Sequence, residues 1–347
     1  MDGIDSVAAD AGADAPAVGG VRYRECVVAF GGVLGSFRRR SGAQAPAPVA
    51  VAPDEARALD EALHDVDWRA FPEGTEFTRF DAPSGALARV ALGRADAPRV
   101  VLVPGATGSK EDFVLMFPLL AAAGYRVESF DLAGQYESSD AGPWRLDPPR
   151  ARYDQRLFLD DLIAVLDDGA GRAHVLGYSF AGTLAQLALL ERPDRFASLT
   201  LLSAPPESGQ VFRGVRHIGP ISGFTSPRQG AALMLWGIRN NLNRVPTSRL
   251  AFVRERFALT RRDSIDDIIA LMMDTPDLRA PIALATVPKL VAVGEHDLWP
   301  RPLHERFARE LNARLAVYHT GHSPCETAPN QLTRDMLALF EASGHPA

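Results

Sequence analysis

The chain has 347 residues, of which 46% are hydrophobic and 23% charged, an ordinary balance for a folded protein with a buried core. This composition excludes a fully disordered chain, a collagen-like chain and a small domain framed by disulfides. A formal charge of −6 excludes a global basic field for nucleic acid. Two cysteines, Cys26 and Cys325, could form at most one disulfide, and their spacing does not indicate one.

The first 53 residues form a predicted N-terminal extension. Residues 1–20 are mainly Ala, Asp and Gly and predict disorder, and residues 42–53 are typical of an extended Pro-Ala linker. The apolar stretch 26–37 is too short for a transmembrane helix, which needs ~20 residues. We interpret it as a hairpin or packed segment, with a surface membrane anchor as the alternative. The acidic start, with Asp2 and Asp5, does not fit a secretory signal, so the expected location is the cytoplasm.

Strands and helices alternate from residue 54 onward. A helix begins at Asp54, and an antiparallel hairpin follows, with strands 76–80 and 86–92 around a Pro-Ser-Gly turn. Six more apolar strands, separated by helical stretches, are predicted at 99–104, 125–131, 173–179, 197–204, 289–294 and 314–320. This alternation predicts an α/β fold with a mostly parallel central sheet covered by helices on both faces.

Residues 205–287 interrupt the alternation, because they contain amphipathic helical stretches and no clear strand. We expect an inserted helical cap over the carboxyl edge of the sheet, where open α/β sheets bind ligands. The predicted core therefore comprises residues 54–204 and 288–347.

The sharpest local motif surrounds Ser179. An apolar strand runs into Gly177, Tyr178, Ser179, Phe180 and Ala181, and an apolar helix follows at once. Small residues two positions on either side of the serine let the chain reverse tightly, which projects the hydroxyl beside a helix N-terminus. The alternative is a serine in an ordinary strand–helix turn.

This motif, with the alternation around it, resembles the α/β-hydrolase superfamily over roughly residues 75–204 and 288–343. The resemblance implies a catalytic serine, acid and histidine in that chain order. It places the acid at Asp297, in the loop after the next-to-last strand, and the base at His322, in a Gly-His loop before the final helix. In such a triad the histidine accepts the serine proton and the aspartate holds the imidazole tautomer.

The same resemblance implies two backbone N–H donors for a developing oxyanion. One is the N–H of Phe180, directly after the serine. The other comes from the loop 103–113, where we assign Ala106 with Thr107 as the alternative, because this chain has Pro-Gly where many relatives have His-Gly.

Other conspicuous residues receive structural interpretations. Asp131 stands in a stretch that resembles a structural loop of the family, and Cys325 is expected to be a buried residue that packs in the core. His296 and His319 are interpreted as surface or structural residues, and His304 has no supporting motif. The chain shows no sequence motif for a metal, for Ca²⁺ or for a nucleotide, so no metal and no cofactor are expected.

These motifs predict a serine hydrolase that cleaves a carboxylic ester through an acyl-enzyme. The alternatives are a thioesterase or acyltransferase acting on an acyl carrier, a cofactor-free lyase, and a non-catalytic binding protein on the same fold. The expected partner is a small-molecule ester or acyl thioester, with no nucleic acid and no transmembrane segment. The sequence assigns no oligomeric state.

The predicted cap suggests a substrate preference. The residues expected to line an apolar pocket are Phe224, Met234, Trp236, Met272 and Met273. Ten arginines against Glu207 and Glu255 give residues 207–262 a formal charge of +8, which favours an anionic substrate or carrier, or an acidic lipid surface. The alternative is that these arginines form an ordinary solvated surface.

Overall fold

The structure is a computed structural model that describes residues 55–215, 228–229, 232 and 245–343. The predicted extension at 1–53, with its apolar stretch 26–37, lies outside the described residues. All described residues belong to Ala45–Ala347, the larger of the two compact units into which the chain divides.

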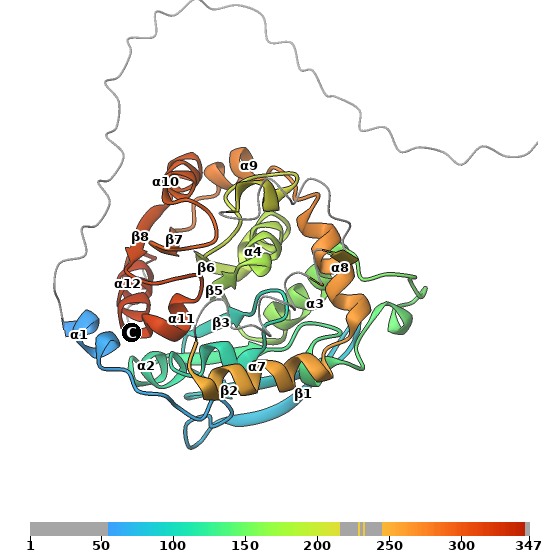
Figure 1. Ribbon diagram of the computed structural model, residues 1–347, viewed down its shortest axis with the longest axis horizontal. Helices are drawn as coiled ribbons and strands as arrows, with labels where there is room; N and C mark the ends of the chain where they lie inside the picture. The colour runs from blue at the N-terminus through green and yellow to red at the C-terminus, as the bar shows by residue number, and fades with distance from the viewer. Residues whose placement is uncertain (1–54, 216–227, 230–231, 233–244, 344–347) are drawn as a thin grey trace, which may run out of the picture. The chain divides into compact units, whose positions relative to one another are not determined.

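The centre of this unit is an eight-stranded sheet with the order β1-β2-β4-β3-β5-β6-β7-β8 (Figure 1). Its strands are β1 (Glu76–Ala82), β2 (Gly85–Leu92), β3 (Arg99–Val103), β4 (Arg126–Phe130), β5 (Ala173–Tyr178), β6 (Phe196–Leu202), β7 (Lys289–Gly294) and β8 (Arg314–Tyr318). The pairs β1–β2 and β2–β4 are antiparallel, and the other five pairs are parallel. The predicted mostly parallel sheet is therefore confirmed.

Burial explains why the strands have different sequence patterns. Every residue of β3, β5, β6 and β7 is buried, so these strands are almost continuously apolar. The edge strand β1 is mostly exposed and carries polar side chains. Gly85, at φ +124°, follows the hairpin turn in a backbone conformation that favours glycine.

Helices cover both faces of the sheet. Apolar side chains of α3 (Gln155–Asp168), α4 (Phe180–Glu191) and α10 (Arg301–Glu310) pack into the core on one face. Those of α2 (Phe117–Ala122) and α12 (Pro329–Glu341) pack into a second core on the other. Helix α1 (Glu55–Glu61) rests on α12, where Asp60 accepts hydrogen bonds from the backbone N–H groups of Asn330 and Gln331.

The helical spacing of residues 112–124 predicts one helix, but the chain forms two pieces there. These are the 3₁₀ turn η1 (Lys110–Phe113) and helix α2. Pro118 lies in the first turn of α2, where its missing N–H is tolerated, whereas a proline inside one longer helix would break it.

The described parts of residues 205–287 contain the helices η5 (Val211–Gly214), α7 (Thr247–Leu259), α8 (Arg262–Met272) and α9 (Arg279–Leu284). Within these described parts, the one β interaction is an isolated bridge between Gly209 and Thr275. Elsewhere among the described residues, the short helices are η2 (Tyr136–Ser138), η3 (Pro143–Arg145), η4 (Pro193–Arg195) and α11 (Pro324–Thr327).

Helices α7 and α8 contact the loop that follows β4 at the carboxyl edge of the sheet (Figure 1). The N–H of Tyr136 donates to Thr260 Oγ1 at 3.1 Å, and the N–H of Arg261 donates to Gly134 O at 2.8 Å. Among the described residues, no helix is long and apolar enough to cross a bilayer.

Candidate active site

Ser179 occupies a strained turn between β5 and α4. Its φ of 51° and ψ of −119° are unusual for a residue with a side chain, and such strain is typical of functional positions. A Cβ on Gly177 would lie 2.5 Å from the carbonyl oxygen of Ala181, and one on Gly182 would lie 2.4 Å from Ala204 Cβ. Glycines at these two positions therefore permit the sharp reversal, and Ser179 itself retains 8% exposure.

Three side chains converge from the carboxyl ends of β5, β7 and β8. His322 Nε2 lies 3.2 Å from Ser179 Oγ, and His322 Nδ1 lies 2.7 Å from Asp297 Oδ1. These distances give a continuous hydrogen-bonded chain from carboxylate to imidazole to hydroxyl. The structure thus brings together the three residues that the sequence nominated for the triad.

Asp297 lies in a buried polar environment that keeps it ionised. Burial alone would raise the pKa of its carboxyl, but the charge and hydrogen bond of His322 outweigh burial, and the pKa falls below its usual value of 3.8. His304 and Ser203 act in the same direction, and His304 Nε2 lies 3.5 Å from Asp297 Oδ2. The backbone N–H of Leu298 also donates to Asp297 Oδ1. Sequence reasoning did not identify His304 or Ser203, because neither stands in a motif.

Two aromatic rings hold the imidazole of His322. The ring of Tyr178 lies 5.5 Å away and that of Trp299 5.8 Å away, both tilted against it. Each ring is itself anchored: Tyr178 Oη hydrogen-bonds Ser323 Oγ at 2.8 Å, and Trp299 Nε1 donates to Val211 O at 2.9 Å. Both rings are buried, so the imidazole has little freedom to leave the line between Asp297 and Ser179.

The loop after β3 lies against the serine. Strands β3 and β5 are neighbours, with Val103 opposite Gly177, and a Cβ on Gly105 would lie 3.0 Å from Ser179 Cβ. Ala106, the proposed donor, is the next residue in this loop. Phe180 is the first residue of α4, so its N–H has no acceptor within the helix.

A buried group of charges connects this loop to the insertion. We call it the Asp112 cluster, and its members are Asp112, Arg249, Arg256 and Glu326. Arg249 Nη2 lies 2.7 Å and Arg256 Nη1 2.5 Å from Asp112 Oδ1, and Arg249 Nε donates to Glu326 Oε2 at 3.0 Å. Burial opposes ionisation of Asp112, but the two guanidinium groups hold the pKa of its carboxyl below the usual range.

Asp131 and Cys325 have the structural environments that the sequence suggested. Asp131 is fully buried and accepts hydrogen bonds from the backbone N–H of Lys110 at 2.8 Å and from Lys110 Nζ at 3.1 Å. It therefore ties the loop after β4 to η1. Cys325 is free and buried, and burial raises the pKa of its thiol well above the ordinary value.

The predicted pocket-lining residues are only partly described. Met272 is buried in the core, and Met273 packs at the margin of the same core. Phe224, Met234 and Trp236 lie outside the described residues. As the lining of a substrate pocket, all five residues stay a prediction.

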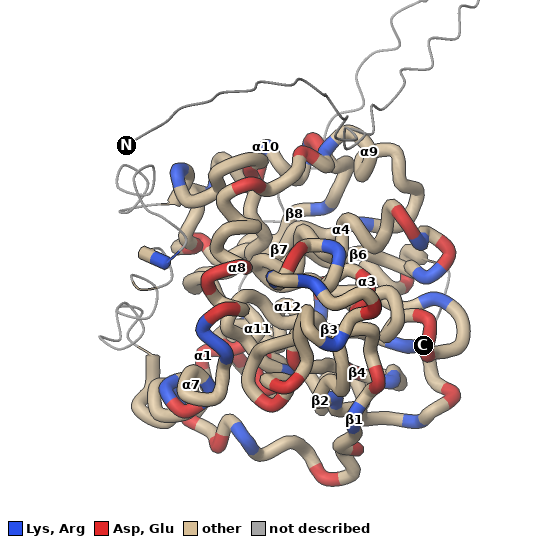
Figure 2. Tube along the Cα trace, turned by 90° about the vertical axis from the view of Figure 1, so that its right-hand side faces the viewer, with Lys and Arg blue, Asp and Glu red and all other residues tan. Residues whose placement is uncertain are grey.

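Several arginines of the insertion are paired with carboxylates. Besides the two in the Asp112 cluster, Arg261 pairs with Asp263 and Arg262 with Asp266. Figure 2 shows acidic and basic positions interspersed along the described chain, including α7 and α8. The formal excess of +8 over residues 207–262 is thus partly neutralised by neighbouring acidic residues, which favours the solvated-surface alternative over attraction of an anionic substrate.

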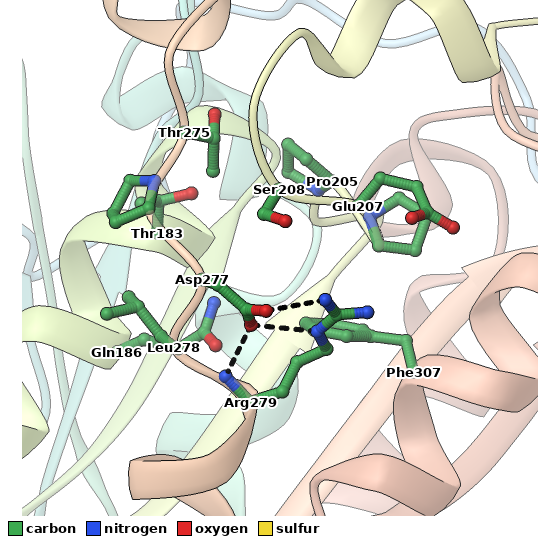
Figure 3. A pocket seen from close by; sticks show the side chains of 12 residues that line it. Thr183, Gln186, Pro205, Glu207, Ser208, Thr275, Asp277, Leu278, Arg279 and Phe307 are labelled. Atoms are coloured by element: carbon green, nitrogen blue, oxygen red, sulfur yellow. Dashed lines mark hydrogen bonds and ion pairs between the residues drawn. The ribbon is translucent and has the colours of Figure 1, made fainter.

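A small cleft lies beside α4 (Figure 3), and none of Ser179, Asp297 and His322 lines it. It is bordered by Thr183 and Gln186 of α4, by residues 205–208 after β6, and by residues 275–279. A double hydrogen bond from Arg279 to Asp277 closes one side, with distances of 2.8 Å and 2.6 Å. The enclosed space of ≈ 10 Å³ is about what one water molecule needs, so this cleft is no substrate pocket.

Comparison with known proteins agrees with the fold and places the chain in a family. Residues 100–335 match the family described as "Alpha/beta hydrolase family". The polyketide synthase ThaQ of Burkholderia thailandensis is 29% identical over 292 residues, which are 76% of this chain but only 13% of ThaQ. A protein of Variovorax paradoxus whose name designates it a carbamate hydrolase, RutD, is 33% identical over 278 residues, 74% of this chain and 97% of that protein.

A solved structure of a hydrolase from Pseudomonas aeruginosa PA01 has the same fold, with a TM-score of 0.62 at 24% identity. The similarity covers 78% of this chain and 99% of that one. With the sheet order, the strained serine turn and the family match over most of the described core, the chain belongs to the alpha/beta hydrolase family.

Proposed function

We propose that the protein hydrolyses a carboxylic ester through an acyl-enzyme, with Ser179 as nucleophile, His322 as general base and acid, and Asp297 as the orienting carboxylate. The observation that carries this proposal is the continuous contact chain from Asp297 Oδ1 to His322 to Ser179 Oγ, at 2.7 Å and 3.2 Å. A serine hydroxyl alone is a weak nucleophile at neutral pH, and this arrangement is what activates it.

In the first half-reaction, Ser179 Oγ forms a bond to the ester carbonyl carbon while its proton passes to His322 Nε2. The carbonyl oxygen becomes an oxyanion, which the N–H groups of Phe180 and Ala106 stabilise. The bond from carbon to the leaving oxygen then breaks, and His322 returns the proton to that oxygen. An alcohol leaves, and the acyl group stays on Ser179 as an ester.

In the second half-reaction, water replaces the alcohol. His322 Nε2 accepts a proton from the water, whose oxygen attacks the acyl carbon, and the bond from that carbon to Ser179 Oγ breaks. The proton returns to Ser179, and a carboxylic acid leaves. Asp297 stays ionised throughout and stabilises the transient imidazolium.

A fluorophosphonate probe followed by intact-mass measurement tests this assignment. We expect one covalent adduct at Ser179 in the wild-type protein and none in Ser179→Ala. Ser343→Ala is a matched control, because the Ser343 hydroxyl donates to Phe340 O at the end of α12, outside the site, and this variant should still label at Ser179. A folded wild-type protein that does not label at Ser179 contradicts the proposal and favours a lyase or a non-catalytic binding protein.

We also propose that residues 205–287 form a cap over this site. Three contacts support the proposal: Arg249 reaches Asp112, the N–H of Arg261 reaches Gly134, and Trp299 Nε1 reaches Val211. Each joins the insertion to a loop at the carboxyl end of a different strand, which is the edge where ligands bind in open α/β sheets.

A thioester is the second candidate substrate, because the similarity to ThaQ links the chain to part of a polyketide synthase. The same three residues would carry the reaction, with a thiol as the leaving group. Matched esters, thioesters and carbamates of one acyl series distinguish the classes by kcat/KM. A thioester preference of ten-fold or more, about 1.4 kcal/mol in the transition state, would replace the ester assignment with a thioesterase.

A further inference from the structure

A second group of potential ligands lies on the two loops that carry Asp297 and His322. Glu295 and His296 follow β7 and immediately precede Asp297, and His319 follows β8, three residues before His322. One possible ligand atom from each of these three side chains lies within 4.8 Å of the other two. His319 Nδ1 is already 2.9 Å from Glu295 Oε2, and the rings of His296 and His319 are 5.4 Å apart.

The backbone fixes the relation between these loops. The N–H of Glu295 donates to Tyr318 O at 2.7 Å, and the N–H of His296 donates to Thr320 O at 2.9 Å. The side chains themselves are accessible, with exposures of 46% for Glu295 and 71% for His319. The two loops therefore have a hydrogen-bonded backbone, and the three side chains that they carry can rotate toward a common centre.

Two imidazoles and one carboxylate are a ligand set typical of divalent transition-metal ions, above all Zn²⁺. Bonds of about 2.0–2.2 Å in tetrahedral geometry separate neighbouring ligand atoms by roughly 3.4 Å. Reaching that separation from at most 4.8 Å needs only rotation of exposed side chains and no change in the core. Exposure leaves the fourth position open to water.

We propose that Glu295, His296 and His319 bind a divalent transition-metal ion such as Zn²⁺, joining the acid-bearing loop to the histidine-bearing loop. The ion binds outside the triad, on side chains that do not contact Ser179. The proposal stands independently of the esterase assignment, because binding needs neither the serine nor turnover.

Titration of the full-length, untagged, chelator-treated protein tests the site. Calorimetry with Zn²⁺ and visible absorption with Co²⁺ report binding without any substrate. We expect wild-type protein to bind Zn²⁺, and His319→Ala, His296→Ala and Glu295→Gln each to weaken the Kd by at least about ten-fold. A triple variant combines His319→Ala, His296→Ala and Glu295→Gln. Zn²⁺ should raise the Tm of the wild-type protein but not of this triple variant, because only the folded wild-type protein binds the ion.

Two control variants show whether Zn²⁺ binds at this group of side chains. His64→Ala removes an exposed histidine elsewhere on the described surface and should bind Zn²⁺ like the wild type. Ser179→Ala should also bind normally, so loss of activity and loss of binding are distinguishable. The proposal is overturned if the triple variant keeps the wild-type Kd, or if the wild-type protein shows no Zn²⁺ binding up to about 1 mM.

Discussion

Arg249 and Asp112 form a buried ion pair that joins helix α7 to the loop after β3. Their side chains are 4% and 3% exposed, and Arg249 Nη2 lies 2.7 Å from Asp112 Oδ1. Asp112 Oδ2 in turn accepts the N–H of Ser109 at 3.2 Å, inside the loop that carries Ala106. The insertion and one wall of the proposed oxyanion site are therefore held by the same carboxylate.

Arg249→Met should destabilise the protein strongly, because it leaves Glu326 and part of Asp112 buried without a compensating charge. Removing one partner of a buried ion pair costs about 3–5 kcal/mol of unfolding free energy. Urea denaturation measures this loss. Arg262→Met is the matched control, since the exposed pair with Asp266 contributes under about 1 kcal/mol. Similar small losses in both variants would show that the Asp112 cluster does not hold the insertion.

Asp297→Asn should leave the fold intact but slow ester turnover by several orders of magnitude. The amide stabilises the wrong tautomer of His322, and about 10⁴-fold is the loss for the corresponding change in a serine protease. Steady-state kcat on a chromogenic ester measures the effect. A rate within a few-fold of the wild type would mean that Asp297 is not the acid of the triad.

Gly177→Ala should disrupt the serine turn, because the added Cβ would lie 2.5 Å from the carbonyl oxygen of Ala181. Overpacking of this kind costs about 1–3 kcal/mol, and here it also displaces Ser179. Thermal denaturation and fluorophosphonate labelling follow the two effects. Gly321→Ala is the matched control, since a Cβ there meets no atom within 4 Å. Normal labelling of Gly177→Ala would show that the tight turn is dispensable.

Asp161 should make the protein less stable as pH rises from about 4 to 7. Burial raises the pKa of its carboxyl to about 7, against the opposing hydrogen bonds from Ser84. Because the folded-state pKa lies above the unfolded value of about 3.9, the stability that it contributes is full below pH 4 and is lost as pH rises through 7. The loss is on the order of a few kcal/mol, since one pKa unit corresponds to about 1.4 kcal/mol.

Asp161→Asn removes this titration while keeping the shape of the side chain. Its unfolding free energy should therefore fall less than that of the wild type between pH 4 and 7, measured by urea denaturation at each pH. Asp140→Asn changes an exposed aspartate outside this helix, serves as the control and should follow the wild type. Parallel curves for Asp161→Asn and the wild type would contradict the assignment.

Neutral and anionic ester substrates should respond alike to ionic strength. Five of the arginines that the structure describes in the insertion are paired with carboxylates: Arg249 and Arg256 in buried ion pairs, and Arg261, Arg262 and Arg279 nearer the surface. Between 0.01 M and 0.15 M salt the Debye length falls from ~30 Å to ~8 Å, so steering of an anion would appear as a drop in its kcat/KM. A selective drop for the anionic substrate would restore the prediction of an anionic preference.

The sequence predicts the framework, and the three side chains of the proposed triad that the structure brings together, better than it predicts their surroundings. Apolar strands and helical spacing are local signals, and they identify all eight strands and the serine turn. Ser179, Asp297 and His322 stand at strand ends in an order that a family resemblance supplies. His304 beside Asp297 has no such signal, because only the packing of α10 against β7 brings it there.

The same limit applies to contacts between segments that lie far apart in the chain. Arg249 is 137 residues from Asp112, and its arginine looks like any other in an arginine-rich stretch. The group of Glu295, His296 and His319 is likewise spread over two loops that meet only when β7 pairs with β8. The periodicity of apolar residues along the sequence carries no information about either of these two contacts.

The separation of 143 positions between Ser179 and His322 has a consequence for how activity arises during synthesis. A ribosome releases the serine turn long before the histidine, so a growing chain holds an unactivated hydroxyl on a nearly finished sheet. On the proposed chemistry, hydrolysis begins only when β8 joins β7 and brings the base into line. If the proposed function holds, assembly of the last strand completes the site, and the onset of ester hydrolysis reports a completed sheet.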